Sequence, residues 1–100
     1  MAKTEEQIKA DITEHIKKRG GAYSVWYVGI AADPKDRLFS DHGVHENEDQ
    51  WIYREAESAR AARNVEEYFI DTLGTDGGSG GGGPNTKYVY AYKKNSHTDP

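Results

Sequence analysis

Residues 26–42 read WYVGIAADPKDRLFSDH, and this stretch decides the fold. The β-branched and aromatic residues at its start predict a strand, which we place at 23–30. Asp33 then offers the side chain of a helix cap, and Pro34 follows at the first helical position, where its missing N–H costs nothing. Gly43 is a natural end for this short helix. The stretch therefore predicts a strand, a tight turn and a helix.

Both faces of the predicted strand are largely apolar. Alternation divides its side chains between the two faces, with Val25, Tyr27 and Gly29 on one and Trp26, Val28 and Ile30 on the other. Strands with two apolar faces are typical of the middle of a sheet that is covered on both sides. We therefore expect this strand to be the central one.

The rest of the chain supplies further helices and strands. A capping box formed by Thr4 and Gln7, followed by isoleucines at every fourth position, predicts a helix that ends at Gly20. The remaining elements are expected at 51–56 (strand), 58–73 (helix) and 88–94 (strand). The resulting order, α-β-α-β-α-β, predicts an α+β domain in which three helices flank a three-stranded sheet.

One domain accounts for residues 1–94, because a chain of 100 residues rarely divides its core. Within it, the segment 74–85 contains the run GGSGGGG, which is typical of a flexible connector. The run lacks the Lys-Ser/Thr ending of a nucleotide-binding loop. Residues 95–100 are expected to form a disordered tail.

Composition excludes several functions. Thirteen Lys and Arg against seventeen Asp and Glu give a formal charge of −4, so bulk charge does not hold the chain on nucleic acid. The absence of cysteine excludes disulfides, thiolate nucleophiles and cysteine-bound zinc. The N-terminal sequence MAKTEEQIKADITEH has the pattern of neither a signal peptide nor a membrane span. We therefore expect a cytoplasmic protein without a membrane partner.

One acidic residue of the long helix is expected to point inward. Ala62, Phe69 and Leu73 recur at helical spacing on one face. Glu66 falls on that same face, whereas Glu67 falls on the opposite one. A charge in apolar surroundings costs free energy unless it is paired, protonated or bound to a cation. Glu66 is therefore either a salt-bridged residue at the edge of the core or a metal ligand, and both interpretations stay open.

The segment YVGIAADPKDRL resembles the second half of the GIY-YIG nuclease signature, with Tyr-x-Gly at a strand end, an Asp-containing turn and a helix that carries Arg. The sequence EEYFI at 66–70 resembles the family's helical Glu, which is followed by apolar residues three and four positions on. Asn85 matches the family's trailing Asn. The resemblance implies a GIY-YIG-like fold and the hydrolysis of phosphodiesters in DNA or RNA with one divalent cation, Mg²⁺ or Mn²⁺.

The resemblance also implies roles for particular residues. Tyr27 would help to activate water, Arg37 would steady the phosphate, and Glu66 would hold the metal ion. His42 would be a second polar contact, and Asn85 would be a positioning residue. General chemistry agrees, because phosphodiester hydrolysis needs charge neutralisation and an activated water, and Mg²⁺ is often held by only one or two carboxylates.

Two departures from the family pattern keep a second function open. The family's first strand, with its Gly-x-Tyr, has no counterpart before Tyr27, because Gly21-Ala22-Tyr23 lies too close to form a hairpin partner. In addition, His42 follows Arg37 by five residues rather than the usual four. The alternative is a non-catalytic module of the same fold that binds nucleic acid or a protein partner.

Two further groups of residues have more than one interpretation. An aromatic face built from Trp51, Tyr53 and the tyrosines at 88, 90 and 92 either stacks nucleobases or, if a helix covers it, is simply core. His42 and His45 could hold Zn²⁺ if Glu46, Glu48 or Asp49 adds a third ligand, although a polar loop that happens to contain histidines is the commoner case.

Overall fold

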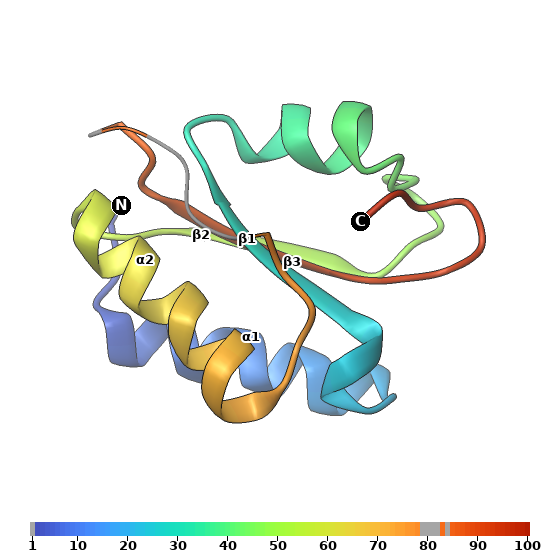
Figure 1. Cartoon of the computed structure of the whole chain (residues 1–100), viewed down its shortest axis with the longest axis horizontal. Coiled ribbons are helices and arrows are strands. Elements are labelled where there is room, and N and C mark those ends of the chain that lie inside the picture. The colour runs from blue at the N-terminus through green and yellow to red at the C-terminus, as the bar shows by residue number, and fades with distance from the viewer. Residues whose placement is uncertain (1, 79–82, 84) are drawn as a thin grey trace.

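The computed structural model describes residues 2–78, 83 and 85–100, and it is an α+β fold with an antiparallel sheet (Figure 1). The three strands of the sheet are β1 (Trp26–Ala31), β2 (Trp51–Glu55) and β3 (Tyr88–Lys93). The helical elements are α1 (Glu5–Arg19), η1 (Tyr23–Val25), η2 (Asp36–Asp41), α2 (Ala59–Glu67) and its continuation η3 (Tyr68–Leu73). The expected fold class and element order are therefore confirmed, with three principal helices in the described part of the chain.

The strand β3, not β1, lies in the centre of the sheet, which has the order β1-β3-β2. The expectation that the first strand is central was wrong. All of β1 is nevertheless buried, because helices cover both faces and the segment at Asp76 covers its outer edge. There the Val28 N–H donates to the Asp76 carbonyl at 2.9 Å, and the Asp76 N–H donates to the Trp26 carbonyl at 2.8 Å. A strand with two apolar faces is thus one that is covered on both sides, but this pattern does not tell whether the strand lies in the centre or at the edge of the sheet.

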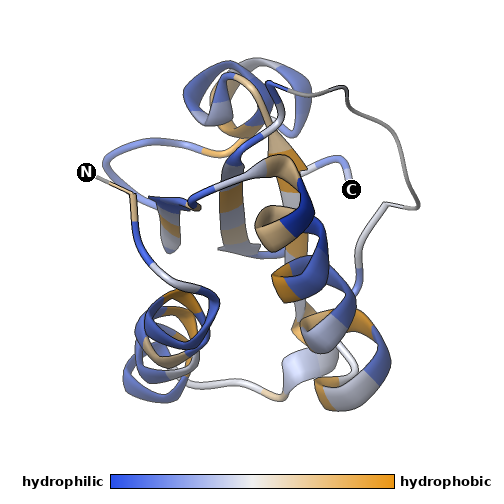
Figure 2. Ribbon diagram, turned by 90° about the vertical axis from the view of Figure 1, so that its left-hand side faces the viewer, coloured by the Kyte–Doolittle hydropathy of each residue, from blue (hydrophilic) through white to orange (hydrophobic). Residues whose placement is uncertain are grey.

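The larger core lies between one face of the sheet and the two long helices, α1 and α2 (Figure 1). Ile8, Ile12 and Ile16 of α1 are each at most 2% exposed, as their spacing predicts. They pack with side chains of α2 and of all three strands. Figure 2 shows both helices with polar outer surfaces and apolar residues turned toward the interior.

A smaller, aromatic core lies on the other face of the sheet, under η2. Leu38 of η2 packs there with Tyr27, Tyr90 and Tyr92, which are all buried. Tyr90 and Tyr92 are thus core residues and not an exposed stacking surface. Only the edge of the expected aromatic face, including Trp51, is partly accessible.

The predicted helix ends are confirmed by their hydrogen bonds. Thr4 and Gln7 form the reciprocal capping box of α1. Asp33 Oδ1 accepts from the Asp36 N–H at 3.1 Å, and Ser58 Oγ accepts from the Ala61 N–H at 3.0 Å. Such caps satisfy N–H groups that have no partner inside the helix.

Two expected flexible segments have different outcomes. Residues 79–82 of the glycine run, and residue 84, lie outside the described residues. The expected tail, in contrast, contacts the loop after η2. Asn95 Nδ2 and His97 Nε2 lie 2.9 and 2.6 Å from carboxylate oxygens of Asp49, and the Asp99 N–H donates to the His42 carbonyl at 2.8 Å.

Across the described residues, no helix is both long enough and apolar enough to cross a bilayer.

Candidate active site

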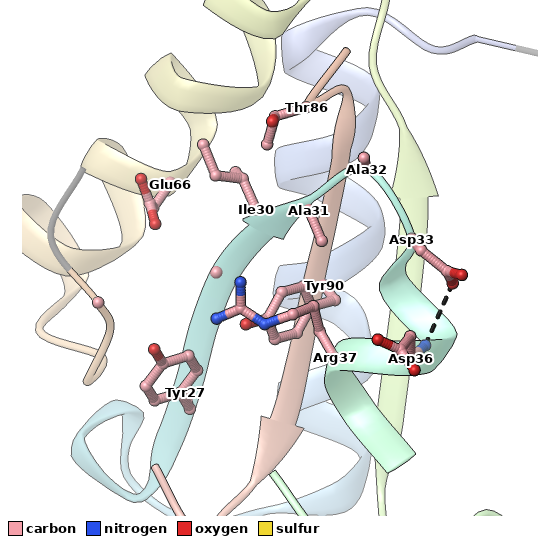
Figure 3. Close-up of a pocket in the computed structure, with 12 residues that line it drawn as sticks. Tyr27, Ile30, Ala31, Ala32, Asp33, Asp36, Arg37, Glu66, Thr86 and Tyr90 are labelled. Atoms are coloured by element: carbon pink, nitrogen blue, oxygen red, sulfur yellow. Dashed lines mark hydrogen bonds between the residues drawn. The ribbon is translucent and has the colours of Figure 1, made fainter. Parts of the chain in front are cut away.

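A cleft of about 310 Å³ opens beside the C-terminal half of β1. Side chains from β1, η2, α2 and β3 meet in it, which is why distant parts of the sequence contribute to one site (Figure 3). Tyr27, Arg37 and Glu66, the three residues that the sequence singles out in this order, all line the cleft.

Glu66 is brought to the cleft by the helical register of α2. Its neighbours on the inner face, Ala62, Val65 and Phe69, are fully buried, and Glu66 itself is 5% exposed, whereas Glu67 is exposed. Burial raises the pKa of Glu66 to about 7, a shift that the adjacent Glu67 increases and that Arg63 opposes. The inward-turned acid predicted from the sequence is therefore present.

Tyr27 lies on β1 in a stack of aromatic rings. Its ring centroid is 5.2 Å from that of Tyr92 and 6.2 Å from that of Tyr90, with near-parallel planes in both pairs. Burial raises the pKa of the Tyr27 hydroxyl, and the Arg37 cation opposes that shift. The phenol and the guanidinium are therefore electrostatically coupled across the cleft.

Arg37 projects from η2 on the opposite side of the cleft. Its Nε lies 3.1 Å from Asp41 Oδ2, one turn along the same helix. In Figure 3 the guanidinium extends toward the space between Tyr27 and Glu66. Because its side chain is 44% exposed, the terminal nitrogens are accessible to a ligand. The Asp41 carboxylate thus orients the Arg37 guanidinium without enclosing it.

The other two candidate residues do not line the cleft. Asn85 is exposed and lies outside it, and Thr86, which is 7% exposed, lines the cleft instead. His42 is 4% exposed and sits beneath the cleft, behind Tyr90. Asn85 and His42 therefore do not lie where they could contact a ligand in the cleft directly.

His42 instead forms the base of a buried hydrogen-bond network. Its Nδ1 lies 2.8 Å from the Asp99 carbonyl, and its Nε2 lies 2.8 Å from the Tyr90 hydroxyl. Since a carbonyl only accepts, Nδ1 carries the proton, and in the neutral ring Nε2 accepts from Tyr90. The Tyr92 hydroxyl lies 3.1 Å from Nδ1. His42 Nε2 is thus a hydrogen-bond acceptor for a phenol that lines the cleft.

Tyr90 is a further cleft residue that sequence reasoning did not assign to the site. Its hydroxyl lies over Gly29, its partner in the register of β1 and β3, and its ring forms part of the cleft wall. The alternation of tyrosines at 88, 90 and 92 indicated one aromatic face. It did not indicate that β3 pairs with β1, and only this pairing brings Tyr90 beside Tyr27.

Glu66 is a residue of the cleft that could hold a hard divalent cation. Burial raises the pKa of its carboxyl group, so the charged form is disfavoured where it stands. A cation removes the cost of the buried charge and leaves the other coordination positions to waters and phosphate oxygens. The predicted metal ligand therefore has suitable surroundings.

A separate group of candidate metal ligands lies on the loop after η2. His45, Asp49 and His97 each offer a ligand atom, and these atoms all lie within 4.8 Å of one another. Burial acts to raise the pKa of Asp49, but hydrogen bonds from the His45 N–H, His97 and Asn95 lower it overall. The pairing of His45 with His42, which the sequence left open as one of two interpretations, is not formed, because His42 faces Tyr90, and the imidazole beside His45 is that of His97 in the tail.

Comparison with known proteins gives no match: no family model, no curated protein and no solved structure is similar to this chain at a significant level.

Proposed function

We propose that this chain is a GIY-YIG-like phosphodiesterase that cleaves nucleic acid with Mg²⁺ or Mn²⁺. The observation that carries the proposal is the convergence of Tyr27, Arg37 and Glu66 on one cleft from three separate elements. Metal-assisted phosphodiester hydrolysis needs charge neutralisation and an activated water, and a buried acid that holds a cation, an accessible guanidinium and a phenol can together supply them.

The position of β3 supports the proposal. The family's first strand is a hairpin partner of the Tyr-x-Gly strand and carries a second tyrosine. In this chain β3 pairs antiparallel with β1, comes from the opposite end of the sequence, and places Tyr90 opposite Gly29. We infer that the strand order is permuted and that Tyr90 takes the place of the tyrosine missing before residue 26. The sequence YVYAYK lacks the family's Gly-x-Tyr, since Tyr88 stands where the glycine would be.

Each side chain of the cleft has a distinct task in this proposal. Glu66 would hold a divalent cation, which when bound would supply charge neutralisation at the phosphate and a water of lowered pKa. Arg37, oriented by Asp41, forms charge-assisted hydrogen bonds to the phosphate. Tyr27 orients the attacking water. Tyr90 accepts a proton from that water while its own hydroxyl proton passes to His42 Nε2.

Three arginines near the cleft support the proposed binding of nucleic acid by an acidic protein. A second hollow of about 520 Å³ is lined by Arg60 and Arg63 of α2, and it shares Ile30 and Thr86 with the cleft. Arg37 lines the cleft itself. A single strand that crosses both hollows would meet these three cations, together with the carboxylates of Asp33, Asp36 and Glu67 that also line them.

Cleavage of labelled nucleic acid tests the proposal. The protein is incubated with single-stranded, duplex and branched DNA and with single-stranded RNA, in Mg²⁺, in Mn²⁺ and in EDTA. We expect metal-dependent cleavage of at least one substrate, with Glu66→Gln about 100-fold slower or worse, as for loss of one stabilising group. Glu67→Gln is the matched control, because Glu67 is the exposed neighbour on the same helix, and it should retain full activity. No cleavage by the unmodified protein, or equal cleavage by both variants, would contradict the enzyme proposal.

A non-catalytic binding module is the second candidate function. The exposed position of Asn85 favours it, because the family's positioning residue then has no contact with the cleft. The partly exposed pair of Trp51 and Tyr53, stacked with ring centroids 5.9 Å apart, offers a small aromatic platform. Binding of an oligonucleotide without cleavage, weakened by Trp51→Ala but not by Glu66→Gln, would select this function.

A further inference from the structure

The strongest unassigned feature outside the cleft is the group formed by His45, Asp49 and His97. Asp49 Oδ2 lies 2.6 Å from His97 Nε2, and the two imidazole rings are stacked with centroids 3.8 Å apart. The three residues come from the loop after η2 and from the C-terminal tail, which is 46 or more residues further along the chain. The antiparallel pairing of β2 with β3, in which Trp51 faces Tyr92, brings these two segments together, and two imidazoles and a carboxylate converge where they meet.

The carboxylate at the centre of this group is held in place by the backbone and by a neighbouring amide. The side chain of Asp49 is only 7% exposed. Its Oδ2 accepts from the His45 N–H at 2.7 Å, and its Oδ1 accepts from Asn95 Nδ2 at 2.9 Å. Hydrogen bonds of this kind orient the side chains that bind a metal ion directly, and they strengthen binding of the metal. The group thus has a fixed carboxylate, with the two rings of His45 and His97 beside it.

We propose that His45, Asp49 and His97 form a zinc site that fastens the C-terminal tail to the domain. Two imidazole nitrogens and a carboxylate oxygen are the protein ligands of open zinc sites, in which water completes the tetrahedron. In such a site, ligand atoms about 2.1 Å from the ion lie about 3.4 Å from one another. The short contact between Asp49 and His97 therefore has to open by less than one ångström, and the ion replaces the proton that the two groups share.

The site has a structural consequence for the buried network under the cleft. Two residues beyond His97, the backbone of Asp99 contacts His42 twice, through its N–H to the His42 carbonyl and through its own carbonyl to His42 Nδ1. Both contacts measure 2.8 Å. A metal ion that fixes His97 therefore also fixes the group that sets the tautomer of His42. The zinc site does not depend on Glu66 or on the proposed nuclease activity.

Calorimetric titration with Zn²⁺, carried out on a Glu66→Gln background so that the cleft does not compete, tests the site. We expect one equivalent of Zn²⁺ to bind. Asp49→Asn and His97→Gln should each weaken binding at least tenfold, whereas His15→Gln, which alters a histidine on α1, should leave it unchanged. Circular dichroism establishes that each variant is folded, and the exposed position of His45 makes His45→Gln a third variant with little risk to the fold.

Hydrogen exchange provides a readout that does not involve activity. Zn²⁺ should slow exchange of the Asp99 amide at least tenfold in the unmodified protein and have no such effect in His97→Gln. Absence of saturable Zn²⁺ binding, or equal affinity of the unmodified protein and the Asp49 and His97 variants, would overturn the proposal.

Discussion

Gly29 of β1 and Tyr90 of β3 face each other so closely that no larger residue fits at position 29. A Cβ atom on Gly29 would lie 2.5 Å from the Tyr90 hydroxyl oxygen and 2.6 Å from the ring carbon that carries it. The glycine of the Tyr-x-Gly sequence therefore makes room for a phenol from the far end of the chain. This relationship connects the most recognisable sequence feature to the residue that sequence reasoning missed.

The first prediction concerns this contact. Gly29→Ala should displace Tyr90, break its hydrogen bond to His42 and destabilise the fold by about 1–3 kcal/mol, as overpacking of a core does. The free energy of unfolding from urea titration measures the effect. Gly83→Ala is the control, because a Cβ there meets nothing within 4 Å, and it should change stability by less than about 0.5 kcal/mol. A Gly29→Ala protein as stable as the parent would show that the contact relaxes freely.

The second prediction separates the two fully buried tyrosines of β3, Tyr90 and Tyr92. Tyr90→Phe leaves His42 Nε2 without its donor, which should cost about 1–3 kcal/mol of stability. It should also reduce cleavage about 100-fold, since loss of a general acid–base group has at least that effect. Tyr92→Phe removes a hydroxyl that lies near His42 Nδ1, and this nitrogen keeps its hydrogen bond to the Asp99 carbonyl. Tyr92 also does not line the cleft. Steady-state cleavage rates that fall equally for both variants would exclude a specific role for Tyr90.

The third prediction is a pH dependence of stability due to Glu66. Its pKa is raised from 4.5 to about 7 on folding, so the folded state binds a proton more tightly than the unfolded state does. Stability from this group is therefore full below pH 4.5 and is lost as the pH rises to about 7. A shift of this size corresponds to about 3 kcal/mol. Without divalent metal, Glu66→Gln should thus gain about 3 kcal/mol relative to the parent between pH 4 and pH 8.

Urea unfolding of the parent, Glu66→Gln and Glu67→Gln at both pH values measures this difference. The change in the free energy of unfolding between the two pH values should be about the same for Glu67→Gln as for the parent. If this change is also the same for Glu66→Gln, the Glu66 carboxylate titrates as an ordinary surface acid and its burial has no energetic effect.

The fourth prediction concerns His15 on α1. Its Nε2 is buried without a hydrogen-bond partner in the described part of the chain, and its ring stands edge-on to Trp26 at 5.7 Å. Burial lowers its pKa from 6.5 to about 4, with Arg19 and Arg54 adding to the shift. An NMR titration of the ring proton shifts should therefore give a pKa of about 4. A midpoint near 6.5 would mean that this ring is solvated.

Local sequence signals predicted the local structure of this chain well. The hydroxyl and carboxylate caps at Thr4, Asp33 and Ser58 each act within a few residues, so they specify helix starts without knowledge of the fold. Glu66 was predicted to point inward for the same reason, because helical periodicity alone determines which face a residue occupies.

Features that depend on long-range pairing could not be predicted in this way. The central position of β3 follows from its pairing with both β1 and β2, whose facing residues are at least 57 and 33 residues away along the chain, and no local pattern specifies such partners. Tyr90 was therefore assigned to an aromatic face and not to the site. His97 was missed as a partner of Asp49 because the tail has the composition of a disordered segment, and only the folded chain brings the two together.

The measurement that most directly tests the central claim is paramagnetic broadening of backbone amide signals by Mn²⁺. If Glu66 is the metal ligand of a cleft shared with Tyr27 and Arg37, substoichiometric Mn²⁺ should broaden the amides around all three residues. That broadening should disappear in Glu66→Gln and persist in Glu67→Gln. Sharp signals around these residues at saturating Mn²⁺, or equal broadening in Glu66→Gln, would contradict the account.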